Sequence, residues 1–106
     1  MSPTARTLQY LKKNGVTAQV VERWNSFAKV RIDLFSVIDI VSIDGLRITG
    51  WQTTSGSNHS ARRKKILESS LAALWVKSGG LLKICSWTKK KHRWIHRIED
   101  INQTTL

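Results

Sequence analysis

Apolar side chains recur at helical spacing near the N-terminus of the chain. Leu8 and Leu11 lie three residues apart, which places them on one face of a helix. The preceding Ser2-Pro3 pair is typical of a helix cap followed by a first helical residue, and Asn14-Gly15 is typical of a left-handed helix end. The pattern predicts a helix over residues 3–14.

A second helical period occurs in the second half of the chain. Leu67, Leu71 and Leu74 follow one another at spacings of four and three. Gly79-Gly80 then interrupts the pattern. We therefore predict one continuous helix over residues 60–78.

The remaining apolar runs are short, rich in β-branched residues and bounded by turn residues, which is typical of strands. Asp44-Gly45 is the strongest hairpin signal, and it makes the runs before and after it antiparallel neighbours. Residues 25–35 have no clear period and are predicted to be a connecting loop. The predicted strands cover residues 17–24, 36–43, 46–52, 81–87 and 94–100, with a basic turn at 88–93 and a frayed tail.

This order of elements predicts a single α/β domain over residues 1–106. Two helices must cover a mixed sheet, because each presents one apolar face. The helix after the third strand is the crossover that a parallel fourth strand needs. No internal repeat or interdomain linker interrupts the pattern.

The charge balance adds a partner to this picture. Eighteen Lys and Arg residues face seven Asp and Glu residues, which gives a formal net charge of +11. Such a field attracts polyanions, so we expect a nucleic-acid partner. No apolar run approaches the roughly 20 residues of a membrane helix. A single cysteine, Cys85, excludes a disulfide within the chain and favours a reducing cytoplasm, with Cys85 as a buried apolar residue.

Asp39 is the unusual acid, because it lies within the otherwise apolar run "VIDIV". An unpaired carboxylate buried there would cost several kcal/mol. Two interpretations are open: a salt bridge to Arg31 or Lys83, or a metal ligand. Asp44 serves the hairpin turn, Glu68 is interpreted as a surface partner of the neighbouring lysines, and Glu99 and Asp100 lie near the tail.

The end of the third predicted strand carries polar side chains. Gln52 and Thr54 are two residues apart and share one face of the strand. The hairpin brings Gln52 close to Asp39. A carboxylate and an amide oxygen suit a hard cation, Mg²⁺ or alternatively Mn²⁺. Glu22 or Asp33 would complete this metal site.

A basic segment follows, at the predicted start of the second helix. Cations in a first helical turn oppose the helix dipole. They form either a solvated face or, with the free N–H groups, a phosphate-binding site. His59 is interpreted as an exposed loop histidine that could touch phosphate. The candidate phosphate-binding residues are Thr54, Ser55, Ser57, His59, Arg62, Arg63, Lys64 and Lys65, with a second set, Lys89, Lys90 and Lys91, in what is otherwise a solvated hairpin tip.

Five tryptophans divide into two groups. Trp51 and Trp75 are predicted to lie in the core. Trp24, Trp87 and Trp94 are interpreted as either structural or able to stack on bases.

Three blocks, "VVERWN", "RIDLFSVIDIV" and "WQTTSGSNHSARRKKI", carry a resemblance to a known group. Together with the order αβββαβ, the chain resembles the PD-(D/E)XK nuclease superfamily. That group includes archaeal-type Holliday junction resolvases, VRR-NUC-like domains, and small phage and bacterial proteins. The likeness covers nearly the whole chain. It implies a restriction-endonuclease-like core, a mixed sheet flanked by helices, in a bacterial or phage-infected cell.

The resemblance also implies roles for individual residues. Asp39 matches the metal-binding aspartate of the family. Gln52 stands in the place of the second acid, and Thr54 in the place of the lysine two residues later. Glu22 takes the part of the family's helical glutamate, although it falls in a predicted strand. A cation of the second helix, Lys64 above all, with Arg62 or Lys65 as alternatives, would replace the missing lysine.

These implications lead to one expected function and two alternatives. We expect metal-dependent hydrolysis of DNA phosphodiester bonds, including those of branched or junction DNA. The first alternative is a catalytically inactive nucleic-acid-binding module on the same fold, and the second is a basic domain that binds an acidic protein surface. A junction resolvase cuts two strands symmetrically, which favours a homodimer, with Leu81, Leu82 and the last strand as a candidate interface.

Overall fold

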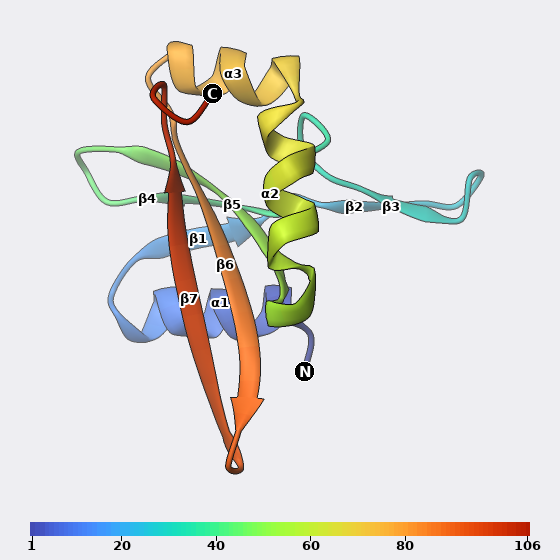
Figure 1. Ribbon diagram of the computed structural model, residues 1–106, viewed down its shortest axis with the longest axis vertical. Coiled ribbons are helices and arrows are strands. Elements are labelled where there is room, and N and C mark those ends of the chain that lie inside the picture. Colours follow the sequence, from blue (N-terminus) through green and yellow to red (C-terminus); the bar gives the residue numbers. More distant parts are fainter.

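A computed structural model describes all residues, 1–106, as a five-stranded mixed sheet with helices on both faces (Figure 1). The strand order in the sheet is β1-β4-β5-β6-β7. A separate two-stranded ribbon, β2-β3, lies outside it. The elements are α1 (Pro3–Lys13), β1 (Thr17–Val20), β2 (Arg23–Asn25), β3 (Val30–Ile32), β4 (Ile40–Ile43), β5 (Ile48–Ser55), a 3₁₀ turn (Gly56–Asn58), α2 (His59–Leu67), α3 (Ser70–Lys77), β6 (Leu81–Lys90) and β7 (Arg93–Ile101).

Two features of the strand connections were predicted from the sequence and are confirmed. β4 and β5 are antiparallel across the Asp44-Gly45 turn, where Asp44 Oδ1 accepts hydrogen bonds from the N–H groups of Leu46 and Arg47 at 2.9 and 2.8 Å. β5 and β6 are parallel, with α2 and α3 as the crossover between them. β5 is therefore a central strand whose two neighbours run in opposite directions.

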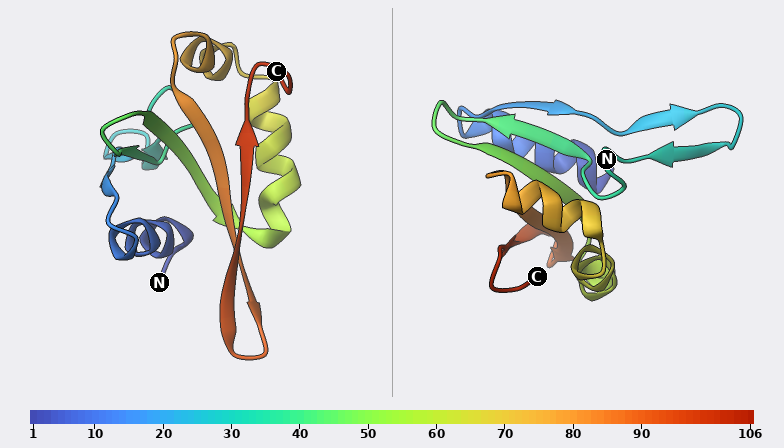
Figure 2. Two further views of the ribbon diagram at one scale, coloured as in Figure 1. Left: turned by 90° about the vertical axis from the view of Figure 1, so that its left-hand side faces the viewer. Right: turned by 90° about the horizontal axis from the view of Figure 1, so that it is seen from above.

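Each face of the sheet has its own apolar cluster. α1 packs on one face, over a cluster that contains Trp51, Cys85 and Trp87. α2 and α3 cover the other face, where Ile66 and Ile84 are fully buried. Figure 2 shows the sheet between these two helical layers. The predicted core positions of Cys85 and Trp51 are confirmed, and no helix is long and apolar enough to cross a membrane.

The second helical segment is broken, so the prediction of one helix over residues 60–78 is wrong. α2 ends at Leu67, and Ser69 adopts an extended backbone and caps α3 by accepting a hydrogen bond from the N–H of Ala72 at 3.1 Å. Serine competes well for such cap positions. α2 also begins earlier, at His59, so the basic residues 62–65 lie beyond its first three positions rather than at its start.

The prediction of a single strand over residues 17–24 and a loop over 25–35 is also wrong. The chain leaves the sheet after β1 and forms the β2–β3 ribbon before returning. Asn25 Oδ1 holds the tip of this ribbon by accepting from the N–H groups of Phe27 and Ala28 at 2.9 and 3.0 Å. β4 starts only at Ile40, and the last hairpin turns at residues 91–92 rather than over 88–93.

The burial of β6 generates a matched stability test. Ile84 in β6 is 0% exposed and Ile95 in β7 is 45% exposed. Ile84→Ala should lower the free energy of unfolding by about 2–5 kcal/mol, because it leaves a cavity in the core. Ile95→Ala should lower it by less than about 1 kcal/mol. Urea unfolding of both variants measures the difference, and equal costs would contradict the burial of Ile84 and the exposure of Ile95.

Candidate metal and nucleic-acid site

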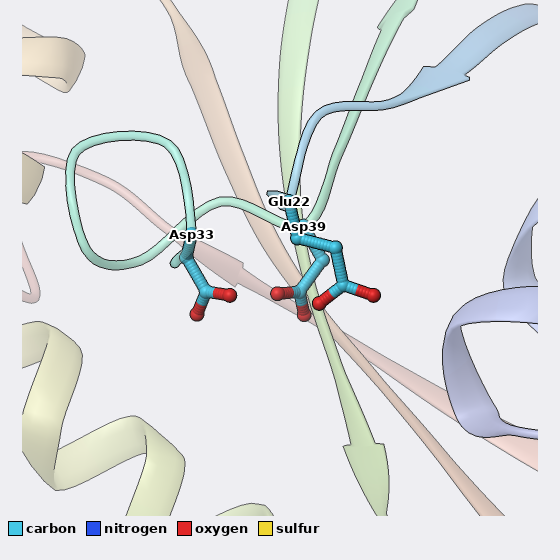
Figure 3. Close-up of side chains that lie close together, drawn as sticks. All are labelled: Glu22, Asp33 and Asp39. Atoms are coloured by element: carbon cyan, nitrogen blue, oxygen red, sulfur yellow. The ribbon is translucent and has the colours of Figure 1, made fainter. Parts of the chain in front are cut away.

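Three carboxylates meet at the edge of the sheet where the β2–β3 ribbon is attached. One oxygen from each of Glu22, Asp33 and Asp39 lies within 4.8 Å of the others. Glu22 comes just before β2, Asp33 just after β3, and Asp39 just before β4. Figure 3 shows the three side chains pointing to the same side. The sequence offered Glu22 and Asp33 as alternatives, and the structure brings both to Asp39.

The main chain at Asp39 holds this edge together. Its carbonyl oxygen accepts from the N–H groups of Val21 and Glu22 at 2.8 and 3.3 Å. Its own N–H donates to the carbonyl of Trp51 at 2.8 Å. Asp39 therefore joins two segments, the residues that lead into the β2–β3 ribbon and the central strand β5. These bonds fix Glu22 beside Asp39.

The Asp39 carboxylate is 3% exposed and binds β5 rather than a cation. Its Oδ2 accepts from Gln52 Nε2 at 2.8 Å, from Thr53 N–H at 2.8 Å and from Thr53 Oγ1 at 3.1 Å. The predicted approach of Asp39 and Gln52 is thus confirmed. The interpretation of a salt bridge from Asp39 is wrong, because Arg31 pairs with Glu22 and Lys83 pairs with Asp100.

α1 contributes to the same network through Thr4. The hydroxyls of Thr4 and Thr53 are 2.7 Å apart. The Thr53 hydroxyl gives its proton to the Asp39 carboxylate, so Thr4 is the donor of this second bond. The N-terminal helix is in this way linked to the acidic residues across one face of the sheet.

The electrostatics of the three acids fit a cation. Burial, a hydrogen bond with Asp33 and the charges of Asp33 and Glu22 together raise the pKa of Asp39 from 3.8 to about 7, although the Thr53 N–H bond acts in the opposite direction. A cation between these groups would reverse this effect, because it favours the charged form of each carboxylate. Gln52 Oε1 is buried and has no hydrogen-bond partner. Carboxylate oxygens with one free amide oxygen are ligands that suit Mg²⁺.

His59 is buried, so the prediction of an exposed loop histidine is wrong. Its ring is 2% exposed, with Nδ1 at 2.6 Å from Ser86 Oγ and Nε2 at 2.8 Å from Glu99 Oε1. Arg63 Nε donates to the other oxygen of Glu99 at 2.6 Å. Burial alone would raise the pKa of Glu99, but the bonds from Arg63 and His59 lower it below its usual value.

This buried network changes the interpretation of two candidate residues. Arg63 and His59 tie α2 to the last two strands, so neither side chain is free in the way a phosphate ligand would be. Glu99 is a central residue of the fold rather than an acid near a loose tail. The sequence contained a weak signal for this arrangement, because His59, Arg63 and Ile66 lie on one helical face that ends in an apolar residue.

The other candidate phosphate-binding residues differ in exposure. Thr54 is 5% exposed, and Ser55 is half-buried at the end of β5, where its hydroxyl is 3.1 Å from that of Ser57. Arg62 is half-buried, whereas Lys64 and Lys65 are exposed. These three cations have no acidic partner within salt-bridge distance, unlike Arg63. Lys89, Lys90 and Lys91 are exposed at the tip of the β6–β7 hairpin, as predicted.

The tryptophans differ in the same way. Trp87 is 9% exposed and donates its indole N–H to Thr7 Oγ1 at 2.9 Å, so the interpretation that it stacks on bases is wrong. Trp94 is covered in part by Arg6, whose guanidinium carbon lies 3.7 Å from the ring centre. Trp24 is 61% exposed. Of the three tryptophans considered for stacking on bases, Trp24 is the most exposed.

The residues suggested for a homodimer interface differ in exposure. Leu82 is 1% exposed and Ile101, at the end of the last strand, is 2% exposed. Leu81 is half-buried beside them. Leu82 therefore offers no apolar surface to a second copy. The last strand, β7, is an edge strand whose residues 93–97 are exposed, with Trp94 at 43% and Ile95 at 45%, so a homodimer through this strand stays a prediction.

Comparisons of the chain with models of protein families, with curated proteins and with solved structures gave no match. The molecule is a mixed α/β domain with a five-stranded mixed sheet and three helices. The likeness to PD-(D/E)XK nucleases remains a prediction from the sequence.

The raised pKa of Asp39 predicts a pH-dependent stability difference. The folded carboxyl holds its proton up to about pH 7, whereas the unfolded one releases it near 3.8. The folded state therefore binds more protons in this window, and wild-type stability falls as the pH rises through it. Relative to wild type, Asp39→Asn should gain a few kcal/mol of stability between about pH 4 and pH 7, at about 1.4 kcal/mol for each pKa unit.

Urea unfolding of both proteins at several pH values, with EDTA present, measures this gain. The titrations of Glu99 and Asp44 are common to the two proteins and cancel in the difference. A stability difference that stays constant across the window would show that Asp39 is ionised throughout.

The buried histidine provides a second matched pair. His59→Asn should lower the free energy of unfolding by about 2–4 kcal/mol, because the shorter side chain loses the bonds to Ser86 Oγ and Glu99 Oε1 and leaves only the arginine contacts of Glu99. His92→Asn should change it by less than about 0.5 kcal/mol, since His92 is exposed and asparagine tolerates its positive φ of 65°. Thermal or urea unfolding gives both values, and equal effects would contradict the network.

Proposed function

We propose that this protein is a Mg²⁺-dependent nuclease that hydrolyses phosphodiester bonds of DNA. The observation that carries the proposal is the meeting of the Glu22, Asp33 and Asp39 carboxylates within 4.8 Å. They lie beside the buried amide of Gln52, whose Oε1 has no partner.

The distribution of charge supports a cation and a polyanion together. The chain has only seven acids against eighteen cations, yet three of the acids share one site. The surrounding positive field attracts nucleic acid. A phosphate close to three carboxylates would be repelled unless a cation lay between them. A metal-bridged phosphate satisfies both conditions.

The residues of the site have separate tasks in this proposal. All three hydrogen bonds to Asp39 use Oδ2, so Oδ1 is the atom left for a cation. Gln52 would offer its free amide oxygen, and Glu22 and Asp33 their carboxylates. When bound, Mg²⁺ or Mn²⁺ would neutralise phosphate charge and lower the pKa of a bound water. The unpaired cations of α2 would bind the phosphate oxygens.

Thr54 favours a second candidate, a nucleic-acid-binding module that does not cleave. Thr54 occupies the position where the resemblance places a lysine, and it is a neutral side chain that is 5% exposed. A hydroxyl cannot stabilise developing phosphate charge as an ammonium does. Cleavage would then depend on a cation supplied by α2.

Metal-dependent cleavage tests the proposal directly. Purified protein is incubated with branched, duplex and single-stranded DNA, with Mg²⁺ or Mn²⁺ or with EDTA. Asp33→Asn and Glu22→Gln should each lower the cleavage rate by about a hundredfold or more, on the scale of one lost electrostatic contact. Glu68→Gln is the matched control, because it removes one exposed acid outside the cluster and should leave the rate unchanged.

Calorimetric titration with Mg²⁺ and Mn²⁺ gives a second readout. The same two substitutions should weaken metal binding, and Glu68→Gln should not. Absence of metal-dependent cleavage of every DNA by the wild-type protein would reject the nuclease. Binding of DNA without cleavage would leave the second candidate as the function.

A further inference from the structure

The β2–β3 ribbon projects from the body of the protein as an arm (Figure 1). Its two strands pair only with each other, in the register Arg23↔Ile32, Trp24↔Arg31 and Asn25↔Val30. Figure 2 shows the arm leaving the sheet at the level of the β1 end. The Asn25 side chain fixes the turn at its tip through two hydrogen bonds. The arm is thus a short ordered ribbon whose outer surfaces have no neighbour in the fold.

The arm exposes aromatic side chains that contribute nothing to the core. Phe27, in the tip, is 100% exposed, and Trp24 is 61% exposed. Val30 is 48% exposed beside them. Exposed aromatic rings on an ordered projection indicate an interaction surface, because these side chains do not stabilise the fold by burial in its core.

The arm also carries exposed cationic side chains close to these rings in the sequence. Arg23, Lys29 and Arg31 are all exposed on the arm. Arg31 pairs at 3.2 Å with Glu22 at the foot of the arm, whereas Arg23 and Lys29 have no acidic partner within salt-bridge distance. The arm therefore carries an excess of positive charge around its aromatic rings.

The arm and the acidic site are parts of one structure. Glu22 precedes β2 and Asp33 follows β3, so two of the three clustered carboxylates form the feet of the ribbon. Strand alternation places Trp24 and Arg31 on one side as a cross-strand pair. The same alternation places Glu22 two residues from Trp24 on that side, which agrees with its contact to Arg31. Trp24 thus lies on the side of the ribbon that leads to the carboxylates.

We propose that the arm binds unstacked bases of a nucleic acid, in single strands or at forks, next to the acidic site, where a bound cation would hold the adjoining phosphate. Trp24 stacks on one base, and Phe27 packs against a base further along. Arg23 and Lys29 contact the backbone. This inference rests on the proposed function in taking nucleic acid as the partner, and it adds which nucleic-acid structure is selected and which element selects it.

Charge and ring placement favour nucleic acid over a membrane. A membrane-inserting tip would gather its apolar side chains at the end of the arm, whereas Trp24 lies on its side, in a strand, opposite an arginine. Base–aromatic stacking tolerates any sequence and adds to phosphate contacts by cations. This combination selects exposed bases, which are absent from the interior of a duplex.

Binding measurements in EDTA test the arm without cleavage. The probes are a labelled oligothymidine strand, a blunt duplex of mixed sequence and a forked duplex. Trp24→Ala and Phe27→Ala should each bind the single strand and the fork about tenfold more weakly, a loss on the scale of one stacked base. Duplex binding and the salt dependence of affinity should stay unchanged, because neither substitution removes a charge.

Leu46→Ala is the matched control. Leu46 is 91% exposed in the β4–β5 turn, so the substitution removes an exposed apolar side chain away from the arm and should change no affinity. Unfolding curves of all three variants should match that of wild type, since none of the three side chains is buried.

The outcomes separate the inference from the proposed function. Wild-type affinities for all three DNAs in both arm variants would overturn the role of the arm and leave the nuclease proposal standing. An equal loss on duplex and single strand would overturn selection of unstacked bases. Phe27-dependent binding to phosphatidylserine vesicles without any effect on DNA would assign the arm to a membrane. Failure of the wild-type protein to bind any DNA would overturn both proposals.

Discussion

The central strand β5 is buried along almost its whole length, and this constraint shapes the rest of the structure. Residues 49–54 are all buried, because helices cover both faces of the sheet. Four of these six residues, Thr49, Gln52, Thr53 and Thr54, are polar. A buried polar group is costly unless it is hydrogen-bonded. The carboxylate of Asp39 takes the bonds of Gln52 and Thr53, and so the central strand requires an acid at the start of β4.

The hydrogen bonds from β5 to Asp39 bring this carboxylate close to two others, which is electrostatically unfavourable. Asp39 is buried next to Asp33 and Glu22, and its pKa rises to about 7 as a result. The polar end of β5 is stabilised, but at the expense of crowding three acids into one place. Crowded carboxylates with a raised pKa are frequent at functional sites, and this crowding is what the proposed cation would relieve. Gln52 Oε1, left without a partner, belongs to the same arrangement.

Features set by neighbouring residues were predictable from the sequence. The Asp44-Gly45 turn and the two-residue strand period together predicted that Asp39 would meet Gln52, and they do. The β2–β3 ribbon was not predicted. It has three residue pairs and exposes apolar side chains, so its sequence lacks the alternation of buried apolar and exposed polar residues that is typical of a strand. The contact of His59 with Glu99 spans 40 residues, and its partners depend on how α2 lies over β6 and β7. The local pattern indicates which face of α2 is turned to the sheet, but not which residues of β6 and β7 it meets.

The same contact constrains which cation of α2 could take the role that the sequence resemblance assigns to a lysine at the position of Thr54. Successive helical residues are separated by about 100° around the axis. His59, Arg63 and Ile66 form the stripe that faces the sheet, since all three contact it or are buried. Arg62 lies next to this stripe and is half-buried, whereas Lys64 and Lys65 lie about 130° from its centre and are exposed. Arg62 is therefore better placed than Lys64 to reach a phosphate at the sheet, and a guanidinium there would also bind two phosphate oxygens at once.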